Sequence, residues 1–321
     1  MVSLLRLMTY EDLEQYLREK NYVVIEGRRV ELKPVKINRL TPTDEELTDV
    51  STTVWSFPKR GRWASHRSNY RGNWAPQIPR ALIEMYSSPG ETVLDQMVGG
   101  GTTCIEARLL GRNCIGVDIR IDSVILTLYR LKLVEDYITE NIDRLEGEEK
   151  IAAENFLRSH ARIYLGDARS LDEIPSGSVD LVATHPPYYN IIRYSSGERL
   201  DGDLSGMRRL EDYLDAIHDI AVETYRVLKH GRYAAFLIGD TRRHKHYVPI
   251  SHYVLEKLLE PGFILKEEII KIQHKMKTTR EVWKRLGNKG FLLIYHEKLY
   301  VLRKPGEKEK TSRYKYSMLR R

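Results

Sequence analysis

The sequence predicts an α/β protein built on a mostly parallel sheet, and two observations lead to this class. From about residue 90 onward, short apolar segments alternate with longer segments of helical periodicity. Such alternation needs a crossover connection between successive strands, which makes the strands parallel. The length of 321 residues fits about two domains, or one large α/β domain with additions.

The alternation defines the expected elements in chain order. Apolar runs predict strands over Thr92–Asp95, Cys114–Asp118, Ile163–Gly166, Val179–Thr184 and Tyr233–Ile238. Helical patterns lie between or after them, over Thr103–Leu110, Ile121–Tyr137, Glu149–His160, Leu210–Leu228 and Pro249–Leu259. No long helix separates Phe263–Ile272 from Phe291–Leu302, so these two segments predict an antiparallel pair at one edge of the sheet.

The first 50 residues predict a small appendage of one helix and two strands. Thr9 and Asp12 have the spacing of a capping box and open the helix, which Asn21 can close. A hairpin around Gly27 follows, and a new helix start is expected over Pro42–Glu46. We therefore expect an appendage over 1–50, a catalytic domain over 51–304 and a basic tail over 305–321.

Composition excludes several broad classes. The chain is 41% hydrophobic and 30% charged, which is enough apolar material for a core and excludes a wholly disordered chain. Its longest apolar run, Tyr233–Ile238, is far shorter than the roughly 20 residues of a membrane helix. The first residues lack the features of a secretory signal. We expect a soluble, cytoplasmic protein with no membrane partner. Scarce Gln and Asn beside abundant Glu, Lys and Arg suggest a thermophilic source.

A glycine-rich turn follows the first strand of the alternating region. Asp95 ends that strand, and the segment from Gln96 to Thr103 contains Gly99, Gly100 and Gly101 before a helix begins. An acid, a glycine loop and a helix N-terminus together form a surface that a ligand can approach closely. Asp118 ends the next strand, about 20 residues further on, where a carboxylate can bind ribose hydroxyls. No Gly-Lys-Ser/Thr follows, which excludes a phosphate loop; a tight turn without a ligand is the alternative.

The order D-x-x-x-G-x-G-T-T resembles the first motif of S-adenosylmethionine-dependent methyltransferases. This resemblance implies that the loop lies beside the methionine part of the cofactor and that the following acid holds the ribose. Asp167 then matches the acid that contacts the adenine amino group, although it could instead cap the segment after it. The resemblance thus implies cofactor contacts from Asp95, Gly99, Gly101, Thr102, Thr103, Asp118, Asp167 and Ala168.

A second motif is more specific. Thr184-His185-Pro186-Pro187-Tyr188 is similar to the S/D/N-P-P-Y/F motif of the amino-methyltransferases, which methylate the exocyclic nitrogen of cytosine or adenine. The stretch from Trp74 through Gln77 to Pro79 resembles their cofactor-closing motif, and His185 would also adjoin the cofactor. The similarity covers about residues 51–304. It implies a Rossmann-like fold with a mostly parallel, seven-stranded sheet and helices on both faces.

The proline motif suits the chemistry of an aromatic amine, whose lone pair is delocalised into its ring. Acceptors around the amine can hold its hydrogens and aim the nitrogen at a methyl group; the Pro186 carbonyl would be one such acceptor. His185 stands where the family has Ser, Asp or Asn, and a neutral imidazole can also accept a hydrogen bond. This departure leaves open the proton acceptor and the choice of cytosine or adenine, and a packed turn residue is the alternative. The resemblance implies a catalytic role for His185, Pro186, Pro187 and Tyr188, the last by stacking on the base.

The two cysteines do not suggest chemistry. Methylation at a ring carbon would need a cysteine nucleophile, but Cys104 and Cys114 lie far from the proline motif in sequence. Two cysteines are also too few for a disulfide framework or a zinc site. We expect both to be small buried residues and expect no metal.

Positive charge is clustered. The net charge is +7, residues 51–80 carry six Lys or Arg and no acid, and residues 303–321 carry eight against two Glu. Aromatic residues alternate with the first basic group, a pattern typical of single-stranded nucleic-acid binding. Alternative interpretations are that the charge clusters are only solvated faces and that the tryptophans belong to the core. Candidate nucleic-acid contacts are Arg60, Arg62, Trp63, Arg67, Arg71, Arg242, Arg243 and Lys245, with a further basic stretch over 271–289.

These features favour methylation of cytosine N4 in nucleic acid. DNA methylases of the family generally carry a large recognition domain, and here only residues 190–207 after the proline motif lack regular structure, as a lid would. The resemblance therefore favours structured RNA, such as ribosomal RNA cytidine, with the archaeal-type enzymes as a subgroup. Alternatives are DNA N4-cytosine or N6-adenine methylation, methylation of a protein amide, and nucleic-acid binding without catalysis. The oligomeric state stays open.

Overall fold

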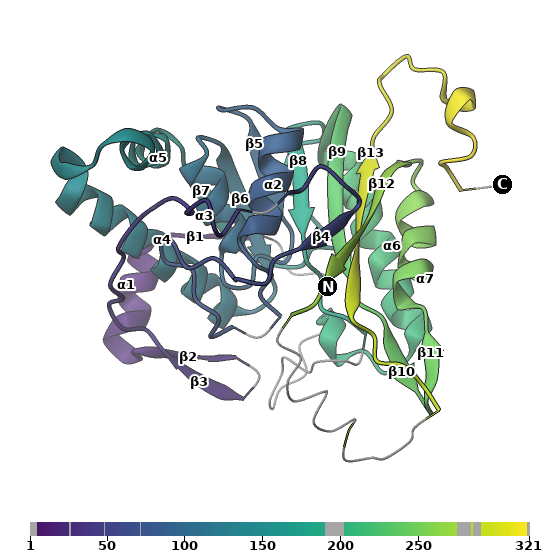
Figure 1. Cartoon of the computed structure of the whole chain (residues 1–321), viewed down its shortest axis with the longest axis horizontal. Helices are drawn as coiled ribbons and strands as arrows, with labels where there is room; N and C mark the ends of the chain where they lie inside the picture. The colour runs from purple at the N-terminus through teal and green to yellow at the C-terminus, as the bar shows by residue number, and fades with distance from the viewer. Residues whose placement is uncertain are drawn as a thin grey trace.

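A single twisted sheet organises the chain, and helices cover both of its faces (Figure 1). The computed structural model describes residues 5–25, 27–47, 49–70, 72–189, 202–274, 284 and 290–319. Within these residues the sheet has nine strands in the order β1-β7-β6-β5-β8-β9-β13-β12-β4. The predicted α/β class is confirmed.

The middle of the sheet is parallel. Five neighbouring strands run in one direction: β7 (Ala161–Leu165), β6 (Asn113–Asp118), β5 (Thr92–Asp95), β8 (Val179–Thr184) and β9 (Leu228–Ile238). The predicted antiparallel pair is also present, because β12 (Ile264–Ile272) pairs with β13 (His296–Arg303), which pairs with β9. These seven strands match the expected sheet, and all six residues of β8 are buried, as a central parallel strand requires.

Two short strands extend the sheet beyond the seven predicted ones. β1 (Arg6–Met8) pairs antiparallel with β7 at one edge, and β4 (Val54–Ser56) pairs parallel with β12 at the other. The N-terminal segment therefore contributes to the same sheet as the central strands. The division into three domains stays a prediction.

Helices form one layer on each face of the sheet. One layer holds α2 (Gln77–Tyr86), α3 (Thr102–Leu109), α4 (Ile121–Asn141) and α5 (Gly147–Arg158), and the other holds α6 (Leu210–Val227) and α7 (Ile250–Leu259). α6 buries Tyr213, Ala216, Ile217, Ile220 and Ala221, a spacing of three and four residues that puts one helical face on the sheet. The core accordingly consists of two apolar clusters, one on each side of the sheet.

Smaller elements complete the described chain. A hairpin of β10 (Thr241–Arg243) and β11 (His246–Val248) follows β9, and 3-10 helices occur at Ile142–Arg144, Leu204–Gly206 and Thr311–Tyr314. None of the helices in the described part of the chain is both long and apolar enough to span a membrane.

The N-terminal prediction is largely confirmed. α1 (Tyr10–Glu19) starts with the predicted capping box, in which Thr9 and Asp12 bond each other's backbone N–H groups. β2 (Tyr22–Ile25) and β3 (Arg28–Glu31) form the hairpin. The unit docks on α4, where the Tyr10 hydroxyl donates to Glu135 (2.8 Å) and Val24 N–H donates to Asp122 (2.9 Å).

The helix expected to start in Pro42–Glu46 is absent, and this prediction was wrong. The Thr43 N–H does donate to Glu46 (3.1 Å), as at a helix start. However, Glu46 also accepts from Arg39 (2.6 Å), and its carbonyl accepts from the buried side chain of Gln77 (3.2 Å). These tertiary contacts hold the segment as a turn against the core.

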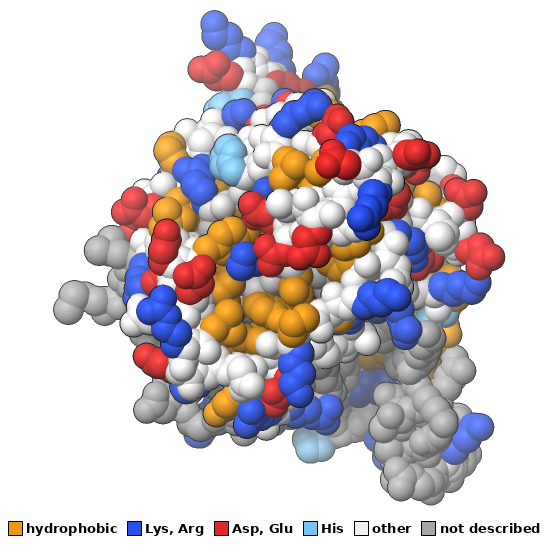
Figure 2. Space-filling view, turned by 90° about the vertical axis from the view of Figure 1, so that its left-hand side faces the viewer, with side chains coloured by type: hydrophobic (Ala, Val, Ile, Leu, Met, Phe, Trp, Pro, Cys, Tyr) orange, Lys and Arg blue, Asp and Glu red, His pale blue; other side chains and the backbone are white. Residues whose placement is uncertain are grey.

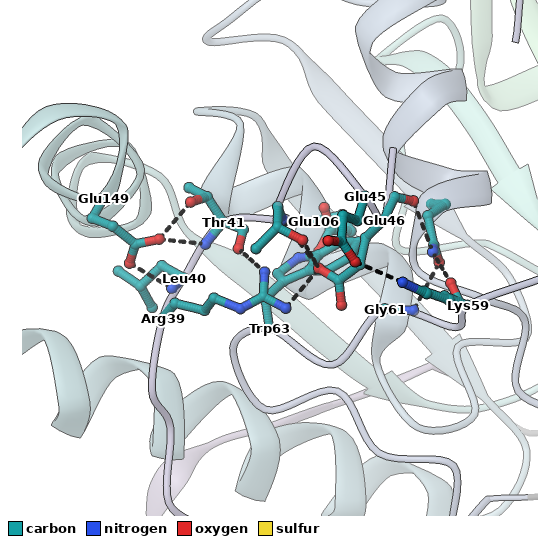
Figure 3. Close-up of polar contacts among 12 residues, drawn as sticks. Arg39, Leu40, Thr41, Glu45, Glu46, Lys59, Gly61, Trp63, Glu106 and Glu149 are labelled. Carbon is teal, nitrogen blue, oxygen red and sulfur yellow. Dashed lines mark hydrogen bonds and ion pairs between the residues drawn. The ribbon is translucent and has the colours of Figure 1, made fainter. Parts of the chain in front are cut away.

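Figure 3 shows how the segment from Arg39 to Trp63 is fixed to the helices beneath it. Glu149 of α5 accepts hydrogen bonds from the N–H groups of Leu40 (2.6 Å) and Thr41 (2.9 Å). At the other end, the indole of Trp63 donates to the buried Glu106 of α3 (2.7 Å). The first basic segment of the chain is therefore anchored on the core.

Cys104 and Cys114 are buried, as predicted, and they are joined by a disulfide that the sequence analysis did not anticipate. The bond connects α3 to the first half of β6. Within the described residues, no three or more His, Cys, Asp or Glu side chains gather in a way that could hold a metal ion.

Candidate active site

A pocket of about 780 Å³, partly open to solvent, lies at the carboxyl ends of β5, β6 and β8. This is the edge at which open α/β sheets bind their ligands. Eight of the predicted site residues line it: Trp74, Asp95, Gly99, Asp118, Asp167, Ala168, His185 and Pro187. The glycine loop and the proline motif, about 85 residues apart in sequence, therefore meet at one cavity.

Asp95 links three segments of the pocket floor by hydrogen bonds. Its carboxylate accepts from the hydroxyls of Thr103 on α3 (2.5 Å) and Thr184 at the end of β8 (2.8 Å), and from the N–H of Met97 (3.1 Å). Burial raises the pKa of Asp95 to about 6, against the opposing effect of these three hydrogen bonds. Asp95 thus fixes the glycine loop relative to the proline motif, whether or not it also contacts a ligand.

Asp118 is placed to receive hydroxyl groups. One carboxylate oxygen accepts from Gly99 N–H (3.0 Å) and the other from Arg120 N–H (3.0 Å). Each oxygen keeps a further lone pair, and the side chain lines the pocket. Burial raises the pKa of Asp118 to about 6, while the two backbone N–H groups lower it.

Two further features test whether the pocket suits S-adenosylmethionine. Gly99 has a φ of 53°, and a Cβ there would lie 3.3 Å from the ring of Tyr70, so the loop keeps its shape only without a side chain. Gln96 is buried in the pocket wall, and its Oε1 accepts a hydrogen bond from the Thr224 hydroxyl (2.8 Å). Its Nε2 has no hydrogen-bond partner in the described chain. An unpartnered buried amide is costly unless a ligand satisfies it. A polar amino-acid moiety would do so.

One side of the pocket, near the predicted Asp167, is lined by Arg120, Asp203 and Leu204, which sequence reasoning missed. Arg120 pairs with Asp203 (3.1 Å) across the cavity, and Leu204 completes the lining. Arg169 donates two hydrogen bonds to Asp167 Oδ2, from Nε (3.0 Å) and from Nη2 (2.7 Å). A Cβ on Gly202 would collide with both side chains. Gly202, Asp203 and Leu204 belong to the expected lid over 190–207, of which 190–201 fall outside the described residues.

Other predicted cofactor contacts support the pocket from outside it. Gly101, Thr102 and Thr103 do not line it; Thr103 holds Asp95 and Thr102 bonds Asn73. The prediction for Gln77 and Pro79 does not agree with the geometry, because both are buried in α2 and neither lines the pocket.

The side chain of Gln77 explains the disagreement. It accepts from Gly61 N–H (3.1 Å) and donates to the carbonyls of Glu46 (3.2 Å) and Lys59 (2.7 Å). Its polar groups are therefore used to hold the basic loop against the core.

A second pocket, of about 710 Å³, adjoins the first. Gly72, Asn73, Trp74 and His185 line both, so they form a common wall. The other lining residues of the second pocket combine aromatic and apolar side chains with charged ones; they are Phe57, Pro58, Arg60, Ala75, Leu237, Lys271, Ile272, His274 and Glu297. Such a lining suits a flat polar ring.

His185 stands in the wall between the two pockets. Trp74 stacks on its ring at 5.7 Å between centroids, and its Nε2 lies 2.6 Å from the Tyr188 hydroxyl. Burial is the main cause that lowers the pKa of His185 to about 4; Glu297 raises this pKa, whereas Lys271 and Arg60 lower it further. The imidazole is therefore neutral near neutral pH.

The structure gives Tyr188 a different place from the predicted one. Its hydroxyl donates to Glu297 (2.7 Å), and its ring packs so closely on Gly239 that a Cβ there would lie 2.5 Å away. Neither Tyr188 nor Pro186 lines the first or the second pocket. Phe57 and Trp74 are better placed to contact a base.

Glu297 was missed by sequence reasoning, and Lys271 was predicted only as the start of the basic stretch 271–289, of which 275–283 and 285–289 fall outside the described residues. They face each other across β13 and β12 and form an ion pair at 2.8 Å. The signal available was weak: one acid just before the apolar run Leu299–Leu302. A buried acid in a strand is unusual without a role or a partner.

The predicted nucleic-acid contacts divide into surface and core residues. Trp63 is fully buried and cannot contact a partner, so that prediction was wrong. Arg60, Arg62 and Arg67 line a surface pocket of about 970 Å³ with His66. Arg243 and Lys245 are exposed on the β10–β11 hairpin and Arg242 is half-buried there. Arg71 lies outside the described residues.

Figure 2 shows a different face, on the side of α1, α4 and α5. Acidic and basic side chains are mixed there around a hydrophobic patch. This face lacks the one-sided positive charge expected of a surface that binds nucleic acid.

The sequence model of a DNA methylase family, covering N6 and N4 methyltransferases, matches residues 8–126 and 179–320. The chain belongs to this family. The matched residues contain both the glycine loop and the proline motif, and the resemblance predicted from those motifs is confirmed.

Individual relatives match over shorter segments. The type II methyltransferase M.ScaI of Streptomyces caespitosus is 36% identical over 101 residues, 30% of this chain and 29% of the relative. The DNA adenine methyltransferase YhdJ of Escherichia coli is 23% identical over 141 residues, 44% and 48% of the two chains. A tRNA (guanine(10)-N2)-dimethyltransferase of Pyrococcus abyssi is 29% identical over 116 residues, 35% and 28%. The matches thus span less than half of each relative.

Solved structures include a DNA modification methylase, TTHA0409 of Thermus thermophilus, complexed with S-adenosyl-L-methionine. It is 26% identical, and the alignment covers 47% of this chain and 59% of that one with a TM-score of 0.33. TrmN of Thermus thermophilus is 20% identical; the alignment covers 73% of this chain and 50% of that one, with a TM-score of 0.42. The cofactor predicted for the family is S-adenosylmethionine, and the residues of the first pocket fit it.

Proposed function

We propose that this protein is an S-adenosylmethionine-dependent methyltransferase that modifies the exocyclic N4 amine of cytosine in nucleic acid, with structured RNA as the favoured substrate. When bound, the cofactor supplies an electrophilic methyl group. The remaining requirements are to hold the cofactor, to hold an extruded base, and to orient its amine.

One observation carries the proposal: His185 stands between a pocket that fits the cofactor and a second pocket that suits a base. A base held in the second pocket would lie against the residues that this pocket shares with the first, and transfer would require its amine nitrogen to reach the methyl donor directly. The buried, neutral imidazole can accept a hydrogen of the amine. Pro187 lines the cofactor side and keeps the turn rigid.

The surroundings of the base pocket support a nucleic-acid substrate. Arg60 lines both the base pocket and the surface pocket that Arg62 and Arg67 share. A phosphate beside the extruded nucleotide could therefore meet these arginines while the base enters the second pocket. Arg243 and Lys245 provide a second basic region at the end of β9.

DNA is the second candidate substrate. The description of the matching family names DNA, and so does the name of the Escherichia coli relative, DNA adenine methyltransferase YhdJ. Structured RNA is favoured by the sequence, because the central region from the glycine loop to the proline motif is occupied by helices and strands of the core. Adenine N6 and guanine N2 are the alternative target amines, the latter named for the tRNA relative.

The test is methyl transfer by the purified full-length protein, followed by mass spectrometry of nucleosides. Total RNA, ribosomal subunits and genomic DNA would each be incubated with labelled S-adenosylmethionine. We expect N4-methylcytidine in RNA, and much less of it with the His185→Ala variant. Label confined to N6-methyladenine, to N2-methylguanosine or to DNA would replace the proposal with the corresponding alternative. No label in any nucleic acid would contradict it.

A further inference from the structure

A chain of four polar side chains leads away from the wall between the two pockets. His185 Nε2 lies 2.6 Å from the Tyr188 hydroxyl, which donates to Glu297 Oε1 at 2.7 Å. The other oxygen of Glu297 accepts from Lys271 Nζ at 2.8 Å. Three elements contribute: the turn after β8, β13 and β12.

The direction of these hydrogen bonds follows from Glu297. Burial alone would raise the pKa of this carboxyl, but Lys271 and His185, with hydrogen bonds from Lys271 and Tyr188, lower it to about 2. An ionised carboxylate can only accept. The Tyr188 hydroxyl must therefore donate its hydrogen to Glu297. The Tyr188 oxygen then accepts a hydrogen bond from the N–H at His185 Nε2.

This direction determines the tautomer of the imidazole. A neutral ring has one N–H, and the hydrogen bond to Tyr188 places it on Nε2. Nδ1 then carries a lone pair, and it is buried with no hydrogen-bond partner in the described chain. The Gly72 backbone lies near the ring and raises its pKa, but it does not meet the geometry of a hydrogen bond to Nδ1.

We propose that Glu297, acting through Tyr188, fixes the tautomer of His185 so that Nδ1 is the acceptor presented to the target amine. Glu297 lines the second pocket, but in this role it is a positioning residue, because its effect reaches the amine through Tyr188 and His185. The inference rests on the proposed function for the identity of the amine. The tautomer itself does not depend on it.

The proton balance is complete without another reactant. The amine nitrogen gives its electron pair to the new N–C bond, and the C–S bond of the methyl donor breaks with its pair staying on sulfur. The proton that the nitrogen loses passes to Nδ1. The resulting imidazolium is stabilised by Glu297 through Tyr188 and later releases a proton to water.

The charged groups around the ring come from several elements and act in opposite directions. Glu297 on β13 favours the protonated ring, whereas Lys271 on β12 and Arg60 in the basic loop disfavour it. Lys271 is paired with Glu297, so the two form a nearly neutral unit. The unit can hold the Tyr188 hydroxyl in place without keeping His185 charged.

Nuclear magnetic resonance of the full-length, ¹⁵N-histidine-labelled protein without ligand tests this directly. Long-range ¹H–¹⁵N spectra report which ring nitrogen carries the proton, and the His185→Asn variant identifies the signal. We expect the Nε2–H tautomer in the wild type. In Glu297→Gln, the new amide can donate to the Tyr188 oxygen and turn the Tyr188 proton toward Nε2, so the Nδ1–H tautomer should increase. The kcat of this variant should fall about 100-fold with little change in KM.

A matched control lies on the same two strands. Glu268 of β12 pairs with Lys298 of β13 at 3.0 Å, but it is partly exposed and lies away from both pockets. Glu268→Gln should change neither the tautomer nor kcat. Glu297→Asp, which keeps the charge, should recover part of the activity lost in Glu297→Gln.

Two results would overturn the inference: an Nδ1–H tautomer in the wild type, as a bond to Gly72 would give, or an unchanged tautomer in a folded Glu297→Gln variant. If that variant does not fold, the wild-type tautomer and the same spectra of Tyr188→Phe decide the matter. Failure of the proposed function would look different. The wild type would then transfer no methyl group to cytosine while the dependence of the tautomer on Glu297 persisted.

Discussion

His185 is the residue through which pH should act on turnover. Its ordinary pKa would be about 6.5, and burial lowers it to about 4. Because the neutral ring is the acceptor, single-turnover methylation at saturating cofactor should be constant above about pH 5 and fall as the pH drops through 4. Rapid-quench measurements across this range test the profile.

Substitutions at His185 separate its chemistry from its packing. His185→Asn and His185→Ser supply an oxygen acceptor that does not titrate, so they should keep measurable activity and lose the acid limb. His185→Ala should lose most of the rate while still binding cofactor. Near-normal turnover by the Ala variant would mean that His185 only shapes the turn, with the Pro186 carbonyl as sufficient acceptor.

Asp118 should control cofactor affinity. Asp118→Asn weakens the hydrogen bonds offered to ribose hydroxyls, and we expect a 10- to 100-fold rise in the Kd of S-adenosylmethionine by calorimetry, since bonds to charged groups contribute about 1.5–3 kcal/mol. Because its pKa is raised to about 6, the carboxylate is protonated below that pH, and wild-type affinity should fall as the pH drops through 6. Asp136→Asn, on the exposed side of α4, is the control and should change nothing. Equal affinities of wild type and Asp118→Asn would remove this assignment.

At the scale of elements, the buried strands were the easiest to predict. Thr92–Asp95 and Val179–Thr184 were predicted to the residue, because buried parallel strands have apolar runs with abrupt ends. β1 and β4 were missed, since three-residue edge strands such as Arg6–Met8 carry no periodicity and owe their structure to a neighbour. The glycine loop and proline motif were found from short motifs, whereas Glu297 becomes part of the site only when β13 lies beside β12.

The disulfide between α3 and β6 should contribute to stability. It joins two cysteines 10 residues apart, and a closed loop of that length restricts the unfolded chain by about 2–3 kcal/mol. Reduction, or the Cys104→Ala/Cys114→Ala double variant, should lower Tm by several degrees in calorimetry. A matched substitution of two buried alanines without a cross-link, Ala152→Gly and Ala153→Gly, gives a reference for local packing loss. An unchanged Tm in the cysteine variant would mean that the bond does not form in solution.

At the scale of the whole molecule, positive charge should determine how binding responds to salt. Arg62→Ser/Arg67→Ser removes two charges from the surface pocket beside the base pocket. The slope of log K against log salt should flatten by about 1.4 for a single-stranded substrate. Arg158→Ser, which removes an exposed arginine at the end of α5, should leave the slope unchanged. The same slope in both variants would place the nucleic acid on another surface.

The wall of Gly72, Asn73, Trp74 and His185 belongs to both pockets, so the two ligands share protein atoms. Any displacement of this wall by one ligand changes the site that the other meets. The coupling free energy is then reciprocal: the factor by which the cofactor alters affinity for the base equals the factor by which the base alters affinity for the cofactor. An inhibitor that fills the base pocket would therefore change the affinity for the cofactor without ever occupying its site.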